Sequence, residues 1–178
     1  KVPNYSVKIE KAEIPISRGL GSSASLIVGG IALANSLNDN YLEDRELLEI
    51  ATEVEGHPDN VAPAIFGGLC VSAIRNKKAY FSKIEISNEQ NFVALIPSYK
   101  VSTEEARKVL PKTIDYKKSI ENMGNTAMII SLIGEKRYKE LKFFLEDYFH
   151  EPYRKILIKD YEKIKRVSND KGAIGTYI

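Results

Sequence analysis

The first forty residues show two successive hydrophobic patterns, first an alternation of apolar and polar positions and then a nearly continuous apolar run. Tyr5, Val7 and Ile9 alternate with polar residues, which predicts a half-buried strand over residues 5–13. Residues 25–37 then form a run that is apolar on almost every side of a helix. Such a helix is normally packed on several sides, and we expect this one to be.

The middle of the chain combines one amphipathic helix with short apolar runs. Asp44 is placed to cap a helix whose apolar residues recur on one side, and Gly56 is placed to end it. Three strands follow in the prediction, separated by polar turns that favour a hairpin or a meander. These strands cover residues 68–74, 79–86 and 92–97.

The second half of the chain reads mostly as helix. Ser102 and Glu105 have the spacing of a capping box, which predicts a helix that ends before Pro111. Three further helices are expected, of which the first carries a methionine-rich face predicted to be buried. Their ranges are 116–133, 137–148 and 155–167.

A glycine–serine turn joins the first strand to the first helix. Its sequence is P-I-S-R-G-L-G-S-S-A-S, beginning at Pro15. Glycine permits a tight turn and a close approach to a ligand, and a helix N-terminus offers unpaired N–H groups to an anion. The serine hydroxyls are suitable donors, or ligands of Mg2+. A plain helix cap is the alternative that residue types alone leave open.

A second polar segment, E-G-H-P-D-N, follows the amphipathic helix. Residue types alone favour a loop in which Asp59 or Asn60 caps a short helix. The functional interpretation is that Glu55 faces a metal ion while Asp59 and Asn60 face a polar substrate. Glu53 is an alternative metal ligand two residues earlier. His57 has no second histidine at a zinc-ligand spacing.

Composition narrows the class of protein. The 178 residues are 43% hydrophobic and 28% charged, with a net charge of +2, which gives no support to nucleic-acid binding. A single cysteine excludes a disulfide within the chain. No signal peptide or membrane-length apolar run is visible, so a cytoplasmic protein without membrane attachment is expected.

The order of four motifs resembles the homoserine kinases of the GHMP kinase superfamily. These motifs are P-x-x-x-G-L-G-S-S-A, E-G-H-P-D-N-V-A-P-A-I-x-G-G, V-S-T-x-x-A-R-x-x-L-P and H-E-P-Y-R. The resemblance runs from Pro15 to the last residue. It implies ATP and Mg2+ as cofactors, L-homoserine as substrate, and threonine biosynthesis as the process. Homodimers are common in that family, so a homodimer is a further expectation.

The resemblance also implies a role for individual residues. Ser23 and Glu55 would coordinate Mg2+, and these two with Asp59 make up the expected catalytic set. Asp59 and Asn60, together with Thr103, Arg107 and Arg154, would bind the substrate, with an arginine fork on its carboxylate. The residues expected to surround the ATP phosphates are Pro15, Ser17, Arg18, Gly19, Leu20, Gly21, Ser22, Ser23 and Ala24.

The fold implied by the resemblance is α+β with the two-domain GHMP kinase arrangement. Residues 1–88 would belong to an ATP-binding domain like domain 2 of ribosomal protein S5, and residues 89–178 to a ferredoxin-like domain of the split β-α-β type. The last residues, G-A-I-G-T-Y-I from Gly172, resemble the beginning of a further glycine-rich motif of the family. The end of that motif and the family's N-terminal segment are absent from the sequence, so an incomplete fold is expected.

Two other functions remain open at the level of sequence. One is a GHMP kinase that acts on another alcohol, such as mevalonate or shikimate. The other is a fragment that binds nucleotide without catalysis. Coupled ADP release with each acceptor would distinguish all three.

Overall fold

The computed structural model describes residues 4–16 and 18–178, apart from the side chain of Thr103. It contains both helices and strands, as the predicted α+β class requires. The chain divides into two compact units, and each is described separately. The first unit contains the residues up to Ile65 and Ser72–Tyr80, and the second contains Phe66–Val71 and Phe81–Ile178.

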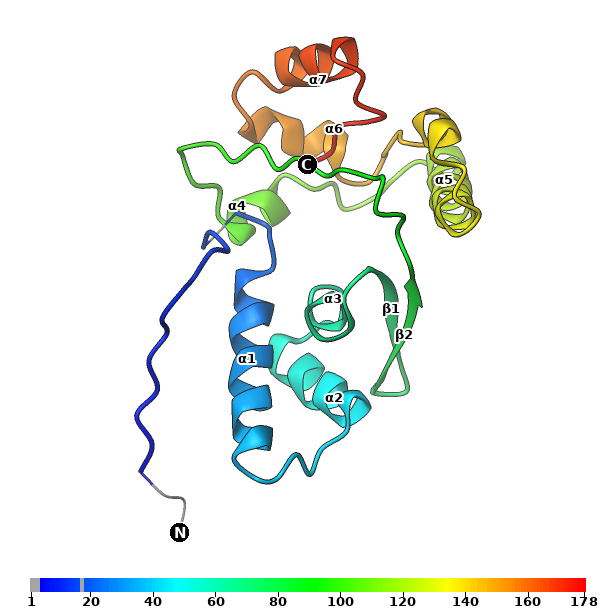
Figure 1. Ribbon diagram of the computed structural model, residues 1–178. Helices are drawn as coiled ribbons and strands as arrows, with labels where there is room; N and C mark the ends of the chain where they lie inside the picture. The colour runs from blue at the N-terminus through cyan, green and yellow to red at the C-terminus, as the bar shows by residue number, and fades with distance from the viewer. Residues whose placement is uncertain (1–3, 17) are drawn as a thin grey trace. The chain divides into compact units, whose positions relative to one another are not determined.

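The first unit is built on two helices that pack against each other. These are α1 (Ser22–Ser36) and α2 (Asp44–Glu55) (Figure 1). The side chain of Asn35 fastens the connection between them, because it donates to the Leu42 carbonyl at 2.9 Å and accepts from the Leu42 N–H at 2.8 Å. The buried apolar residues of this unit are Ala24, Leu47, Leu48, Ala51, Val61, Ala62 and Ala79.

Both helices differ in detail from the sequence prediction. The expectation that the first helix is packed on several sides is wrong, because Leu26 is 57% exposed and Leu33 is 42% exposed. The second helix is capped by Glu43 rather than by Asp44, since the Glu43 N–H donates to the Glu46 carboxylate at 2.9 Å. The predicted end at Gly56 is confirmed, and this glycine adopts a left-handed φ of 90°.

A hairpin follows the short helix α3 (Val61–Phe66). It pairs β1 (Leu69–Arg75) with β2 (Lys78–Ile84) through the two-residue turn Asn76–Lys77. Both turn residues have positive φ, 52° and 62°, as a hairpin turn that matches the strand twist requires. Two of the three predicted middle strands are therefore confirmed.

The predicted strands over residues 5–13 and 92–97 are wrong. Within the residues described, neither segment joins a ladder, and the only sheet is the two-stranded hairpin. The apolar side chains of these segments are exposed, including Val7 at 68% and Val93 at 82%. Alternation predicts a strand only where a partner strand is present to satisfy the backbone.

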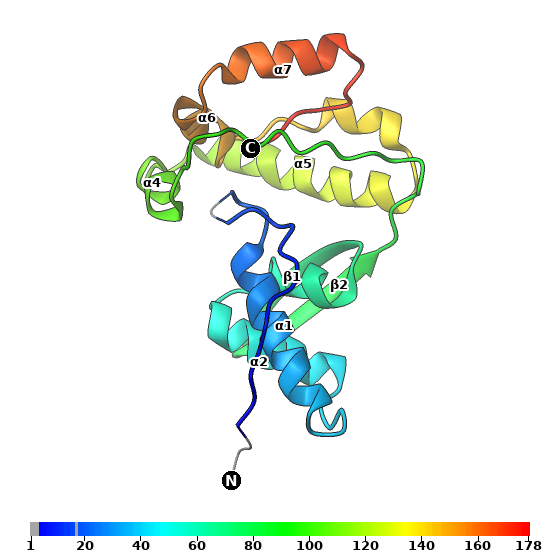
Figure 2. The ribbon, with the colours of Figure 1, turned by 60° about the vertical axis from the view of Figure 1, so that its left-hand side comes forward.

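The second unit is mostly helical (Figure 2). Its first helix, α4 (Thr103–Lys108), has the predicted capping box, with the Glu105 N–H donating to Ser102 Oγ at 3.1 Å. The long helix α5 (Tyr116–Gly134) is also confirmed, but its methionine face is not buried, since Met123 is 69% exposed. The remaining elements are η1 (Tyr138–Phe143), α6 (Glu151–Arg154), η2 (Lys155–Leu157) and α7 (Tyr161–Asp170).

The last two predicted helices are broken in the structure. Only the six-residue 3-10 helix η1 forms within residues 137–148. The predicted helix over 155–167 is divided into η2 and α7, because Asp160 takes a left-handed φ of 59° between them.

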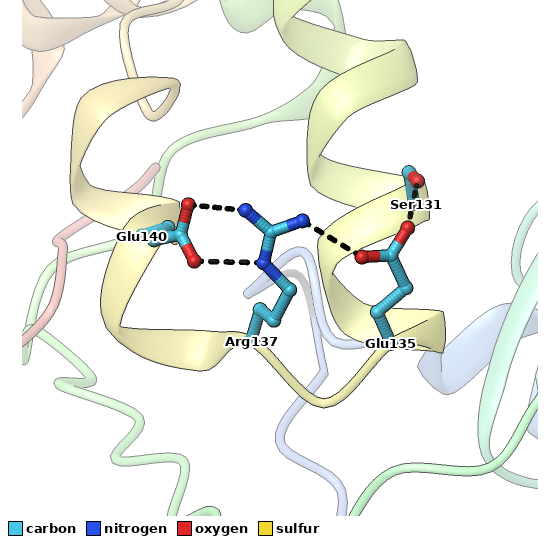
Figure 3. A network of polar contacts seen from close by, with 4 residues as sticks. All are labelled: Ser131, Glu135, Arg137 and Glu140. Atoms are coloured by element: carbon cyan, nitrogen blue, oxygen red, sulfur yellow. Dashed lines mark hydrogen bonds and ion pairs between the residues drawn. The ribbon is translucent and has the colours of Figure 1, made fainter.

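A network of polar contacts joins the end of α5 to the start of η1 (Figure 3). The guanidinium of Arg137 donates to both oxygens of Glu140, at 2.7 and 2.6 Å, and to Glu135 at 2.8 Å. Ser131 donates to the other Glu135 oxygen at 3.0 Å. The hydrogen bonds that Arg137 donates to Glu140 and then to Glu135 raise the pKa of its guanidinium. The network fixes the direction in which the chain leaves α5.

Candidate active site

The glycine-rich loop of the first unit leads directly into α1. Gly19 and Gly21 both have left-handed φ angles, 69° and 73°, and Gly21 is the N-cap residue of the helix. Ser25 Oγ donates to the Gly21 carbonyl at 2.9 Å and fastens the turn. The N–H groups of the first helical turn are left without helical partners, which is the arrangement that binds phosphate.

The other residues predicted to bind ATP lie around this turn. Leu20 is exposed, while Pro15, Arg18 and Ser22 are half-buried and Ala24 is fully buried. The role of all these residues in binding ATP stays a prediction. Ser17 lies outside the described residues.

Gly21 is also where the second polar segment approaches the loop. A Cβ atom at position 21 would lie 3.3 Å from Asn60 Oδ1. The predicted phosphate loop and the predicted substrate-binding amide are therefore adjacent in the first unit, although Asn60 follows Gly21 by 39 positions in the sequence.

Replacing Gly21 with Ala is expected to destabilise this loop. The left-handed backbone costs a residue with Cβ about 1–2 kcal/mol, and the new methyl group crowds Asn60. We expect a lower Tm in thermal unfolding. Gly29→Ala is the matched control, because that position lies inside α1 with no atom within 4 Å of the new Cβ, and helix propensity favours alanine there. Equal effects of the two substitutions would contradict the prediction.

Ser23 and Glu55, predicted as metal ligands, are in direct contact. Ser23 Oγ donates to Glu55 Oε2 at 2.8 Å, so the first turn of α1 meets the last residue of α2. Ser23 is exposed and Glu55 is half-buried. Glu53, the alternative ligand, is exposed on the same helix.

The donor set fits a Mg2+ ion. A hydroxyl and one carboxylate oxygen lie together beside the glycine turn. Among the residues that the structure describes, no three His, Cys, Asp or Glu side chains converge on one point as metal ligands. Mg2+ is commonly held by one or two protein carboxylates with water and phosphate oxygens completing the shell, so a two-residue site suits it.

Asp59 is held by its immediate neighbours. Its Oδ1 contacts His57 Nδ1 and accepts the Asn60 N–H at 3.1 Å. The carboxylate is 69% exposed, so it remains accessible to a ligand. The Asn60 carbonyl accepts the N–H of Ala64 at 3.3 Å and so begins α3 through the backbone. The contact between His57 and Asp59 was not foreseen from the sequence, where His57 was considered only as a zinc ligand.

In the second unit, the structure brings α6 beside α4. Arg154 Nε donates to the Ala106 carbonyl at 3.3 Å, next to Arg107. Arg107 is exposed and Arg154 is half-buried. This hydrogen bond uses the Nε–H of Arg154. The other four N–H groups of the guanidinium belong to its two terminal nitrogens. The side chain of Thr103 lies outside the described part, and only its place at the start of α4 is known.

Arg154 is the last residue of α6, where the helix dipole favours a positive charge. Asp147, which the sequence analysis does not single out, stabilises the start of that helix. Its carboxylate accepts the backbone N–H groups of Phe149, His150 and Glu151, at 2.8, 2.9 and 2.7 Å. The signal for it was an aspartate four residues before Glu-Pro.

Asp147 makes the stability of the second unit dependent on pH. Burial acts to raise the pKa of Asp147, but the backbone hydrogen bonds outweigh it and hold the pKa below 3.8. A depressed carboxylate pKa adds stability above pH 3.8 that is lost as the pH falls through the folded-state pKa. Asp147→Ala is expected to lose about 1 kcal/mol at neutral pH, and the difference from wild type should shrink in acid. Denaturant titrations at several pH values measure this.

Asp115 offers the comparison for that experiment. It caps α5 through a single side-chain hydrogen bond, from the Lys118 N–H at 3.1 Å. Asp115→Ala is therefore expected to lose less stability than Asp147→Ala. A pH-independent loss in the Asp147 variant would contradict the proposed linkage.

Comparison with known proteins agrees with this arrangement. Residues 2–68 match the family described as GHMP kinases N terminal domain. The crystal structure of homoserine kinase from Cytophaga hutchinsonii superposes with a TM-score of 0.83 at 28% identity, over 92% of this chain and 54% of that one. Residues 2–68 therefore resemble the N-terminal domain of the GHMP kinases, and the chain shares the fold of that crystal structure over 92% of its length.

The chain is also similar to curated homoserine kinases. The chain is 40% identical to the homoserine kinase of Clostridium beijerinckii and 45% identical to that of a Clostridium botulinum type A strain, in both cases over all 178 residues. A putative homoserine kinase from Listeria monocytogenes has a TM-score of 0.72 at 27% identity, over 94% of this chain and 56% of that one. The chain spans 60% of the length of the clostridial relatives.

No helix within the described residues is both long enough and apolar enough to cross a membrane.

Proposed function

We propose that the protein to which this chain belongs is a homoserine kinase, which converts ATP and L-homoserine to ADP and O-phospho-L-homoserine. The observation that carries the proposal is the contact of Ser23 with Glu55 beside the Gly19–Gly21 turn. The 40–45% identity to proteins named homoserine kinase supports the choice of acceptor. Because the chain spans 60% of those relatives, the activity is assigned to the protein expressed from its complete reading frame.

The loop and the first turn of α1 would bind the phosphates of ATP. Their N–H groups and the positive end of the helix dipole favour the charge of the β- and γ-phosphates. Ser23 and Glu55 would hold Mg2+, which neutralises phosphate charge when bound. The half-buried Glu55 has the negative charge that this role needs, and its hydrogen bond to Ser23 keeps the two oxygens together.

The acceptor would be bound through both charged groups of an amino acid. The exposed carboxylate of Asp59 suits the ammonium group, and Asn60 can bind a neighbouring polar atom. Arg107 and Arg154 suit the carboxylate, because guanidinium forms charge-assisted bidentate hydrogen bonds with it. Thr103 stays a predicted ligand on the same helix as Arg107.

The reaction that follows is an in-line transfer. The homoserine hydroxyl oxygen bonds to the γ-phosphorus, the bond from that phosphorus to the β,γ-bridging oxygen breaks with its electron pair on ADP, and the hydroxyl proton leaves to solvent. We assign no residue as general base. The residues present would act by orienting the hydroxyl and by stabilising charge on the phosphoryl group. A homodimer is the form expected from the resemblance, and sedimentation velocity measures the oligomeric state. A cytoplasmic location stays the expectation drawn from the sequence.

Coupled ADP release tests the proposal directly. The protein from the complete reading frame and residues 1–178 alone are each assayed with L-homoserine, mevalonate and shikimate. ADP release that depends on homoserine supports the proposal. Release with another alcohol alone would overturn the acceptor but leave the phosphate site standing. Tight binding of MgATP without ADP release would favour a nucleotide-binding protein without catalysis.

A further inference from the structure

The helix that carries Arg154 is too short to hold its own direction. α6 has four residues, and isolated helices of that length are unstable in water. Its orientation must therefore come from contacts with the rest of the second unit. Asp147 supplies one of these contacts by accepting three N–H groups at the start of the helix.

Glu151 supplies a second contact from the first residue of α6. Its carboxylate pairs with Lys165 of α7, and the side chains of Glu151 and Lys165 are only 13% and 33% exposed. Separating these two side chains costs free energy, because each charge would then be poorly solvated and without its partner. The ion pair therefore fixes the rotation of α6 relative to α7.

Two tyrosines also lie close enough to the Glu151 carboxylate to be affected by its charge. Tyr161, at the start of α7, is 5% exposed, and its pKa is raised by burial and then by Glu151. The pKa of Tyr177 is raised to about 12 by burial, then by the charges of Glu151 and Asp147. Glu151 is thus enclosed by α7 and the C-terminal segment rather than directed to solvent.

The orientation of α6 decides where Arg154 points. Arg154 follows Glu151 by three residues, and its Nε donates to the Ala106 carbonyl of α4 at 3.3 Å. A rotation of so short a helix would break this hydrogen bond and move the terminal guanidinium nitrogens. The same rotation would leave the glycine turn and Ser23 untouched within the first unit.

We propose that Glu151 is a positioning residue: through its pair with Lys165, it holds Arg154 beside α4 in the orientation that binds the acceptor's carboxylate. This inference rests on the proposed function for its kinetic readout. It assigns Glu151 a role without any contact to substrate. Specificity for an amino acid over a simple amino alcohol then depends on an ion pair outside the binding site.

Steady-state kinetics of Glu151→Gln, in the protein from the complete reading frame, test the proposal. We expect the KM for L-homoserine to rise about 10-fold, in line with one weakened charge-assisted hydrogen bond, with kcat and the KM for ATP within twofold of wild type. Glu140→Gln is the matched control, because it also removes a glutamate from an ion pair of the second unit, on an element without a predicted ligand. It should leave all three constants unchanged.

A second acceptor separates positioning from general damage. 3-Aminopropan-1-ol has the hydroxyl and amine of homoserine but no carboxylate. If Glu151 acts through Arg154, Glu151→Gln should lower kcat/KM for homoserine about 10-fold and leave kcat/KM for the amino alcohol unchanged. An equal fall for both acceptors would overturn the proposal. The double variant Glu151→Gln/Lys165→Gln should recover part of the homoserine KM, because neither charge is left unpaired.

A spectroscopic measurement keeps this test separate from the proposed function. The Nε–H resonance of Arg154, assigned by its absence in Arg154→Lys, reports the hydrogen bond to Ala106 without any substrate. Glu151→Gln should shift this resonance and increase its exchange with water, whereas Glu140→Gln should not. An unchanged resonance overturns the positioning role even if the wild type phosphorylates homoserine. A shifted resonance in a protein that ignores homoserine retains the positioning role and overturns only the function.

Discussion

Glu55→Gln is expected to lower the rate of homoserine-dependent ADP release by about 100-fold or more, comparable with losing one preorganised electrostatic group. Glutamine can still accept a hydrogen bond from Ser23, which now contacts Glu55 at 2.8 Å, so the fold around the loop should persist. What is lost is the negative charge proposed to hold Mg2+. The measurement is coupled ADP release over a range of Mg2+ concentrations, in which the variant should need more metal for its half-maximal rate.

Two further substitutions on α2 test whether the effect is specific to Glu55. Glu49→Gln removes a charge from an exposed position of the same helix and should leave the rate and the Mg2+ dependence unchanged. Glu53→Gln tests the alternative ligand. A loss in Glu53→Gln that equals or exceeds the loss in Glu55→Gln would transfer the metal role to Glu53. Retention of normal Mg2+ dependence in Glu55→Gln would remove Glu55 from the proposed site.

The second large effect is expected from Arg154→Ala. A hydrogen bond to a charged group is worth about 1.5–3 kcal/mol, so loss of the guanidinium should raise the KM for L-homoserine by about 10- to 150-fold. The KM for ATP should stay within twofold, because Arg154 is predicted to bind only the acceptor. The same initial-rate measurements give both constants.

Arg154→Lys separates charge from geometry. Lysine keeps the positive charge but cannot donate to the Ala106 carbonyl and hold a carboxylate in a planar fork at the same time, so it should recover only part of the affinity. Arg166→Ala, which removes an exposed arginine from α7, is the control and should change neither KM. A normal homoserine KM in Arg154→Ala would exclude this residue from the carboxylate site.

The elements that the sequence predicts well are those whose signals are local. The sequence predicts α2 from its apolar side and from Gly56 at its end. It predicts α4 from the capping box of Ser102 and Glu105, three residues apart. Both sets of contacts lie within one or two helical turns. The segments around Val7 and Val93 also carry a local pattern, but a ladder needs a second strand, and the pattern does not contain one.

The site shows the same division between local and distant information. The Gly19–Gly21 turn follows from glycine spacing, because left-handed φ angles at a helix start favour glycine. The contact of Glu55 with Ser23 joins positions that are 32 apart, and no local pattern predicts such a contact. The role of Glu55 as a metal ligand is therefore supported at the level of sequence by the family resemblance. The contact of Arg154 with Ala106 spans 48 residues and was not foreseen. The sequence does not predict the helix break at Asp160, because a residue with positive φ is usually a glycine and this one is an aspartate.

The division of the chain into two units has a consequence for dissecting the protein. The chain passes from one unit to the other three times, after Ile65, Val71 and Tyr80. A protease that cuts one exposed bond, for example in the Asn76–Lys77 turn, therefore yields two fragments that each hold part of both units. Neither fragment inherits a complete set of packing partners. Separately expressed halves should be easily digested, and after a single nick the two pieces should remain associated until denatured.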